Sequence, residues 1–139
     1  MTLPASRPKA VLLVLLAMFM LLMGTLHFVK APAFVDMMPS ALARWALPLV
    51  LISGFFELAG GVGLLIPALR RPAAWGLVAL YIAVFPANLN MAINHVAVQG
   101  VTFPSWTLWA RLPFQLVFIG LAAWFAQPDA ARKRDAIRR

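Results

Sequence analysis

The sequence lacks cysteine and contains few charged residues. Cysteine is absent from all 139 residues, so no disulfide, thiolate nucleophile or cysteine-ligated metal can come from this chain. Only 12% of the residues are charged and 63% are hydrophobic. In a typical soluble domain about 25% of the residues are charged and about 45–50% are apolar. The polar side chains are too few to cover a water-facing surface, which excludes a soluble enzyme and a disordered or fibrous chain.

Acidic residues are scarcer still: there are four, against twelve Lys and Arg, and the net charge is +8. This excess does not indicate a nucleic-acid partner, because the basic residues lie between long apolar runs and form no single patch. Each run is close to the ~20 residues that cross the hydrocarbon core, and none alternates as a barrel strand does. The runs are residues 11–29, 45–69, 73–94 and 106–125. The sequence therefore predicts an all-α, four-helix transmembrane bundle.

The positions of the basic residues predict the orientation, since short cytoplasmic loops are rich in Lys and Arg. Nine of them lie before the first run, between the second and third runs, or in the tail; only Lys30 and Arg44 lie in a loop on the other side. Both termini are therefore predicted to be cytoplasmic. The first run exceeds the apolar region of a signal peptide and is expected to remain as a permanent helix. The predicted organisation is a cytoplasmic segment (1–10), a membrane domain (11–126) and a basic cytoplasmic tail (127–139) that contacts anionic lipid.

Half of the eight glycines fall in the second run. Small residues let membrane helices approach closely, so this helix is predicted to be central to the bundle. The loop before it, residues 30–44, mixes apolar and charged side chains and is predicted to lie on the membrane or fold over the bundle. The turn Arg70-Arg71-Pro72 is predicted to be tight, which makes the second and third helices antiparallel neighbours.

Polar side chains at membrane depth are the most informative feature of the sequence. At a rise of ~1.5 Å per residue, they descend from ~4 Å below the outer surface at His27 to ~18 Å at Glu57. They come from all four runs and are His27, Ser53, Glu57, Asn88, Arg111 and Gln115. A buried ionisable group costs about 2.5–3.5 kcal/mol and finds a partner. Glu57 and Arg111 are the predicted pair, bridged by Asn88 or Gln115; alternatively, Glu57 is protonated and neutral.

Prolines interrupt the third and fourth runs. Pro86 and Pro113 each remove a backbone donor and free a carbonyl one turn back, that of Ile82 and of Trp109. These are either tolerated kinks or kinks that open a polar cavity. The polar residues have two corresponding interpretations: a satisfied network that joins the helices, or a binding or reaction site open to the outer face. We favour the site, because every helix contributes to it.

The two histidines, His27 and His95, raise the question of haem or metal binding. Both are predicted to lie near the outer surface, which does not suit a buried pair of axial haem ligands. A metal site with His27 and Glu57 is disfavoured by their predicted depth difference of ~14 Å. We therefore predict no metal site.

A series of short motifs runs in order through the four runs. They are His27-Phe28 after Gly24, the segment 34–39, Ser53-Gly54-Phe55-Phe56-Glu57 with Gly60-Gly61, Leu64-Leu65-Ile66-Pro67, Phe85-Pro86-Ala87-Asn88 and Arg111-Leu112-Pro113-Phe114-Gln115. Over about residues 15–125 the chain resembles the DoxX-like family of small bacterial membrane proteins. The resemblance implies a four-helix bundle in the bacterial inner membrane. Named relatives are subunits of thiosulfate:quinone oxidoreductase and of oxidoreductase complexes that cope with oxidative stress. The family's polar residues correspond here to His27, Glu57, Asn88, Arg111 and Gln115.

These observations favour a redox-associated subunit that binds a quinone or small sulfur species in an outward-facing polar cavity. Glu57 would relay protons and Arg111 would stabilise an anionic group, as candidate catalytic residues. The candidate ligand-binding residues are His27, Ser53, Asn88 and Gln115. Without cysteine, a redox role needs a bound quinone, an external substrate or a partner oxidoreductase. The alternatives are a non-catalytic small-solute carrier, which would need a homodimer, and a membrane assembly scaffold. The sequence leaves open whether the protein is an enzyme.

Overall fold

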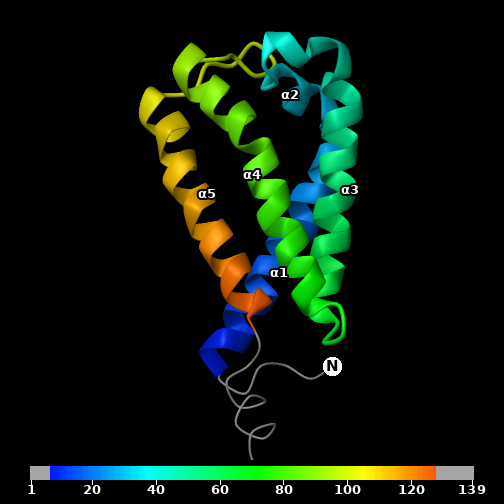
Figure 1. Ribbon diagram of the computed structural model, residues 1–139. Coiled ribbons are helices and arrows are strands. Elements are labelled where there is room, and N and C mark those ends of the chain that lie inside the picture. The colour runs from blue at the N-terminus through cyan, green and yellow to red at the C-terminus, as the bar shows by residue number, and fades with distance from the viewer. Residues whose placement is uncertain (1–6, 128–139) are drawn as a thin grey trace, which may run out of the picture.

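The computed structural model describes residues 7–127, and within them the chain is helical. The long helices are α1 (Arg7–Val29), α3 (Ala46–Leu65), α4 (Arg70–Asn94) and α5 (Ser105–Ala126) (Figure 1). Two short elements, α2 (Ala31–Asp36) and the 3₁₀ helix η1 (Ser40–Trp45), connect α1 to α3. The described residues contain no strand apart from one isolated bridge, Val98 to Val101. The all-α prediction is confirmed; most of the predicted basic tail lies outside the described residues.

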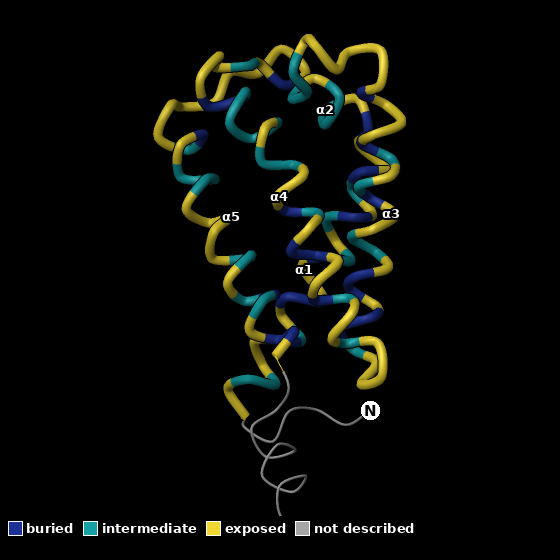
Figure 2. Tube along the Cα trace, viewed as in Figure 1, coloured by how far each residue is buried: buried dark blue, intermediate teal, exposed yellow. Residues whose placement is uncertain are grey.

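Four helices in the described part of the chain are long and apolar enough to cross a membrane: α1, η1 continued by α3, α4 and α5. Exposed residues follow the outward faces of these helices, and buried residues face the bundle (Figure 2). Large apolar side chains such as Leu15, Phe55 and Trp106 are among the exposed ones. Such a surface suits lipid, since hydrocarbon requires outward apolar side chains and backbone groups bonded within the helix. The chain is a multi-pass membrane protein.

The turn between α3 and α4 lies earlier than predicted. α3 ends at Leu65, and Ile66 takes an extended conformation with φ −94° and ψ 115°. Pro67 explains this end, because the residue before a proline is restricted to extended backbone. The tight turn is therefore formed by residues 66–69, and the basic pair that was predicted to form it begins α4.

α3 packs against both α1 and α4, and α5 packs against α4, so the predicted central position of the second span is confirmed. Glycines allow the close approach of α1 and α3. A Cβ atom on Gly54 would lie 2.6 Å from the Cβ of His27, and one on Gly24 would lie 2.9 Å from the carbonyl oxygen of Gly54. A larger side chain at either position would force the helices apart.

The bundle has two packed regions of buried side chains. The first lies toward the end of the bundle at which α3 connects to α4, and it includes Leu13, Leu64, Leu77 and Phe125. The second is formed at the other end by Met91, Ala92, Val98 and Leu108, with Met37 packed against it. Between the two regions the side chains leave a cavity.

Candidate functional site in the membrane cavity

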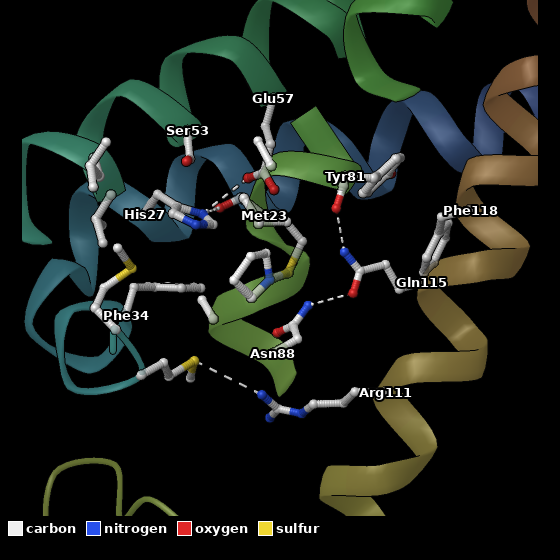
Figure 3. A pocket seen from close by; sticks show the side chains of 18 of the residues that line it. Met23, His27, Phe34, Ser53, Glu57, Tyr81, Asn88, Arg111, Gln115 and Phe118 are labelled. Atoms are coloured by element: carbon white, nitrogen blue, oxygen red, sulfur yellow. Dashed lines mark hydrogen bonds and ion pairs between the residues drawn. The ribbon is translucent and has the colours of Figure 1, made fainter. Parts of the chain in front are cut away.

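The cavity has a volume of about 970 Å³ and is lined by all four long helices, by α2 and by the segment that follows α2. This volume lies at the upper end of the range for small-molecule sites, about 300–1,000 Å³. Most of the lining is apolar, chiefly phenylalanine and methionine side chains. Its polar lining residues are His27, Ser53, Glu57, Tyr81, Asn88, Arg111 and Gln115 (Figure 3). All six predicted site residues therefore line one cavity.

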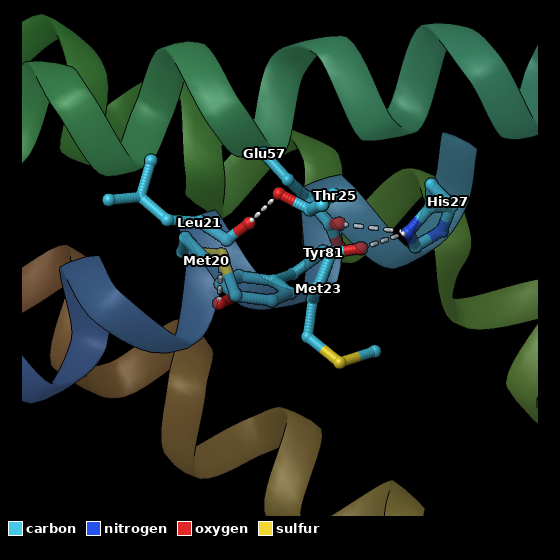
Figure 4. A network of polar contacts seen from close by, with 7 residues as sticks. All are labelled: Met20, Leu21, Met23, Thr25, His27, Glu57 and Tyr81. Carbon is cyan, nitrogen blue, oxygen red and sulfur yellow. Dashed lines mark hydrogen bonds and ion pairs between the residues drawn. The ribbon is translucent and has the colours of Figure 1, made fainter. Parts of the chain in front are cut away.

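His27 and Glu57 form a polar pair on the α1–α3 side of the cavity. The Nδ1 atom of His27 lies 3.0 Å from Oε2 of Glu57 and 2.9 Å from the carbonyl oxygen of Met23 (Figure 4). A carboxylate and a carbonyl are both acceptors, so Nδ1 carries a hydrogen. That hydrogen points to the carbonyl oxygen of Met23. Oε2 of Glu57 is buried and accepts no well-oriented hydrogen bond from the described chain. The carboxyl group therefore keeps unused acceptor capacity.

The predicted ~14 Å depth difference between His27 and Glu57 is wrong. Counting residues assumed that α1 and α3 reach the outer surface at the same level. Instead, the segment that contains α2 and η1 folds over the end of α1, so α1 ends below the level at which the second span begins (Figure 1). Phe34 of α2 stacks on His27 with ring centroids 3.9 Å apart. The loop 30–44 thus folds over the bundle and covers the histidine.

Arg111 on α5 does not pair with Glu57. Its Nη1 atom lies 3.2 Å from the sulfur of Met91 and 3.9 Å from that of Met37. The guanidinium carbon lies 5.9 Å from the ring centroid of Phe103. Within residues 7–127 Arg111 forms no ion pair with a carboxylate. The predicted Glu57–Arg111 pair is therefore wrong, because the carboxyl group is turned toward α1 across the cavity (Figure 3).

A chain of hydrogen bonds fixes the two amides between these walls. The Nε2 atom of Gln115 donates to the backbone carbonyl of Tyr81, and Oε1 of Gln115 accepts from Nδ2 of Asn88 at 2.9 Å. A carbonyl only accepts, so both amide orientations follow from it. The acceptor is the carbonyl of Tyr81, one residue before Ile82, whose carbonyl Pro86 is predicted to free. The side chain of Tyr81 is buried, whereas that of Ile82 is 60% exposed. In the described structure Oδ1 of Asn88 accepts no hydrogen bond from this network.

Aromatic side chains form the floor of the cavity, and the sequence analysis missed them. Phe118 stacks against Phe19 at 4.8 Å and against Tyr81 at 5.9 Å between centroids. The hydroxyl of Tyr81 donates to the sulfur of Met20 at 3.0 Å. One available signal was that Tyr81 is the only tyrosine in an apolar span. Met20 and Met23 on α1 also line the cavity.

Ser53 lines the cavity on α3, one helical turn before Glu57. His95 lies apart from the cavity, in a left-handed conformation after α4, where its Nε2 lies 3.0 Å from the hydroxyl of Ser105. Among residues 7–127 no group of three or more His, Asp or Glu side chains is placed to hold a metal ion. The polar groups that line the cavity are therefore one imidazole–carboxyl pair, one guanidinium, two amides and two hydroxyls.

Residues 16–126 match the model of a protein family described as a domain of unknown function (DUF8561). The chain belongs to this family. The match includes the full polar lining of the cavity and nearly all of the four spans. No curated protein and no solved structure matches the chain significantly. The resemblance to the DoxX-like family stays a prediction.

Proposed function

We propose that this protein is a subunit of a redox complex in the bacterial inner membrane and binds a quinone in the cavity. The observation that carries the proposal is the arrangement of the lining: a cavity of about 970 Å³ with apolar side chains throughout and hydrogen-bonding groups on two facing walls. A quinone is complementary to such a space, because it is a flat apolar ring with an oxygen atom at each end. The resemblance to DoxX-like proteins supports the redox assignment.

The polar groups of the cavity suit both the oxidised quinone and the reduced quinol. Arg111 and the amide nitrogen of Asn88 would donate to a quinone carbonyl, and the carboxyl group of Glu57 would accept from a quinol hydroxyl. When bound, the quinone would supply the exchange of electrons and protons. The His27–Glu57 pair would hold a proton beside the ring, and the aromatic floor would exclude water. Since the chain has no cysteine, we expect a partner oxidoreductase to exchange the electrons.

Ligand binding to the purified protein tests this proposal. The protein is prepared in an uncharged detergent, and its unfolding is followed with decylubiquinone or with decylbenzene, which has the same alkyl chain and no ring oxygens. At about a hundredfold excess over Kd, a specific ligand stabilises the folded state by about 2.7 kcal/mol. We expect this stabilisation from the quinone and little from decylbenzene. Equal effects of the two compounds would show that only apolar partitioning occurs.

A matched pair of variants assigns the binding to the cavity. Glu57→Gln removes the carboxylate there, and Asp36→Asn makes the same change at a residue that accepts from the backbone N–H of Gln99 outside the cavity. We expect Glu57→Gln to retain its helix content and to bind decylubiquinone about tenfold more weakly, a loss of about 1.4 kcal/mol. Asp36→Asn should bind normally. A wild-type protein that binds no quinone and is purified with a tightly bound partner protein would point to the scaffold alternative.

A further inference from the structure

Arg111 brings a positive charge to the cavity that no described group neutralises. Its closest contacts are the sulfur atoms of Met91 and Met37 and the ring of Phe103. Thioether sulfur is a weak acceptor, so most of the five guanidinium donors lack a strong one. A guanidinium at membrane depth is costly unless it has an anion or strong acceptors beside it.

The acidic residues of the described chain are committed elsewhere. Asp36 accepts from the backbone N–H of Gln99 in the outer loops, and Glu57 lies beside His27 across the cavity. The other two acids in the sequence, Asp129 and Asp135, lie outside the described residues. The counter-charge that Arg111 requires can therefore come from a bound molecule.

Resting on the proposed function, we propose that the cavity selects an amphipathic organic anion, with its acidic head group on Arg111 and its apolar body among the methionine and phenylalanine side chains. Arg111 suits this role, because a guanidinium donates two parallel hydrogen bonds to an anionic oxygen pair. Asn88 lies between Arg111 and Gln115 (Figure 3), and its amide orientation is fixed by the chain that ends at the carbonyl of Tyr81. An ionised hydroxyquinone and a long-chain carboxylate both offer the required chemistry.

The test compares two decyl naphthoquinones that differ only in one acidic ring hydroxyl, together with dodecanoate, which carries a charge and no ring. Affinities are measured by calorimetry in uncharged detergent at neutral pH. We expect the ionised hydroxyquinone to bind at least about tenfold more tightly than its neutral partner. Lowering the pH until the ring hydroxyl is protonated should remove this preference in the wild-type protein. Binding of dodecanoate would indicate that the charge alone is recognised, and its failure would indicate that the ring is required as well.

Two variants and a control assign the preference to Arg111. Arg111→Gln should lose this preference and bind the neutral quinone more weakly, because one donor to its carbonyl is replaced, and Arg111→Lys should retain part of the preference. Arg44→Gln removes a positive charge from η1, at a residue that stacks on Trp45 and does not line the cavity, and should change nothing. Equal affinity of the wild-type protein for both quinones, or a preference that survives in Arg111→Gln, overturns the inference and leaves the proposed function intact. If no quinone binds and dodecanoate binds through Arg111, the proposed function fails and the anion site stands.

Discussion

Replacing Gly54 with alanine should separate α1 from α3 and disturb the His27–Glu57 pair. The new Cβ would lie 2.6 Å from the Cβ of His27 and 3.1 Å from the carbonyl oxygen of Gly24. Carbon atoms in contact lie about 3.5–4.0 Å apart, so the helices must move by about 1 Å. The carbonyl oxygen of Gly24 belongs to the backbone and the Cβ of His27 is bonded to it, so neither atom can move away by side-chain rotation. Overpacking of this kind costs about 1–3 kcal/mol, from which the better helix propensity of alanine subtracts up to about 1 kcal/mol.

The assay is reversible unfolding in mixed micelles of dodecyl sulfate and uncharged detergent, followed by helical circular dichroism. Gly76→Ala is the matched control, because Gly76 also lies within a long helix and a Cβ there meets nothing within 4 Å. We expect Gly54→Ala to lose about 1–2 kcal/mol of stability and Gly76→Ala to be neutral or slightly stabilised. Quinone binding should weaken only in Gly54→Ala. Two variants of equal stability would refute the close approach of α1 and α3.

Further predictions concern the polar lining. Double-mutant cycles on the free energy of unfolding test the two pairs. His27→Gln and Glu57→Gln should be coupled by about 0.5 kcal/mol or more. The effects of Glu57→Gln and Arg111→Gln should add within about 0.5 kcal/mol, because the two residues share no partner. Coupling between Glu57 and Arg111 alone would instead restore the pair that the sequence suggested. Gln115→Leu should cost about 1–3 kcal/mol, because Nδ2 of Asn88 loses its acceptor; an unchanged unfolding midpoint would show that the amide chain contributes nothing to stability.

The sequence predicted the spans and the membership of the cavity better than the contacts within it. Hydropathy identifies a membrane helix, because the bilayer demands about 20 apolar residues, and rare polar side chains at depth must turn inward. Glu57 and Arg111 could therefore be assigned to the interior. Their partners could not, because pairing depends on how far one helix is shifted along another. That shift follows from how residues 30–44 fold over α1, and hydrophobicity does not encode it.

The same reasoning explains what the sequence analysis missed in the lining. Phe34 and the aromatic floor residue Phe118 are apolar, and apolar residues in a membrane protein carry no positional signal, because lipid and interior accept them equally. Phe34 reaches the site only because α2 folds back onto α1. The early end of α3, by contrast, was accessible from Pro67 and its effect on the preceding residue.

The two facing walls of the cavity belong to different helix pairs, so a ligand that binds between them should link the pairs. Glycines hold α1 against α3, which carry His27 and Glu57, whereas Asn88 and Arg111 lie on the proline-containing pair α4 and α5. The pairs meet at the end where α3 connects to α4 and Gly63 faces α4, and they meet again at the aromatic floor. At the level of the polar residues the cavity separates them. A ligand that contacts both walls therefore adds contacts between the pairs that the protein itself lacks there. Substitutions on opposite walls, additive in the ligand-free protein, should become coupled when the ligand is bound.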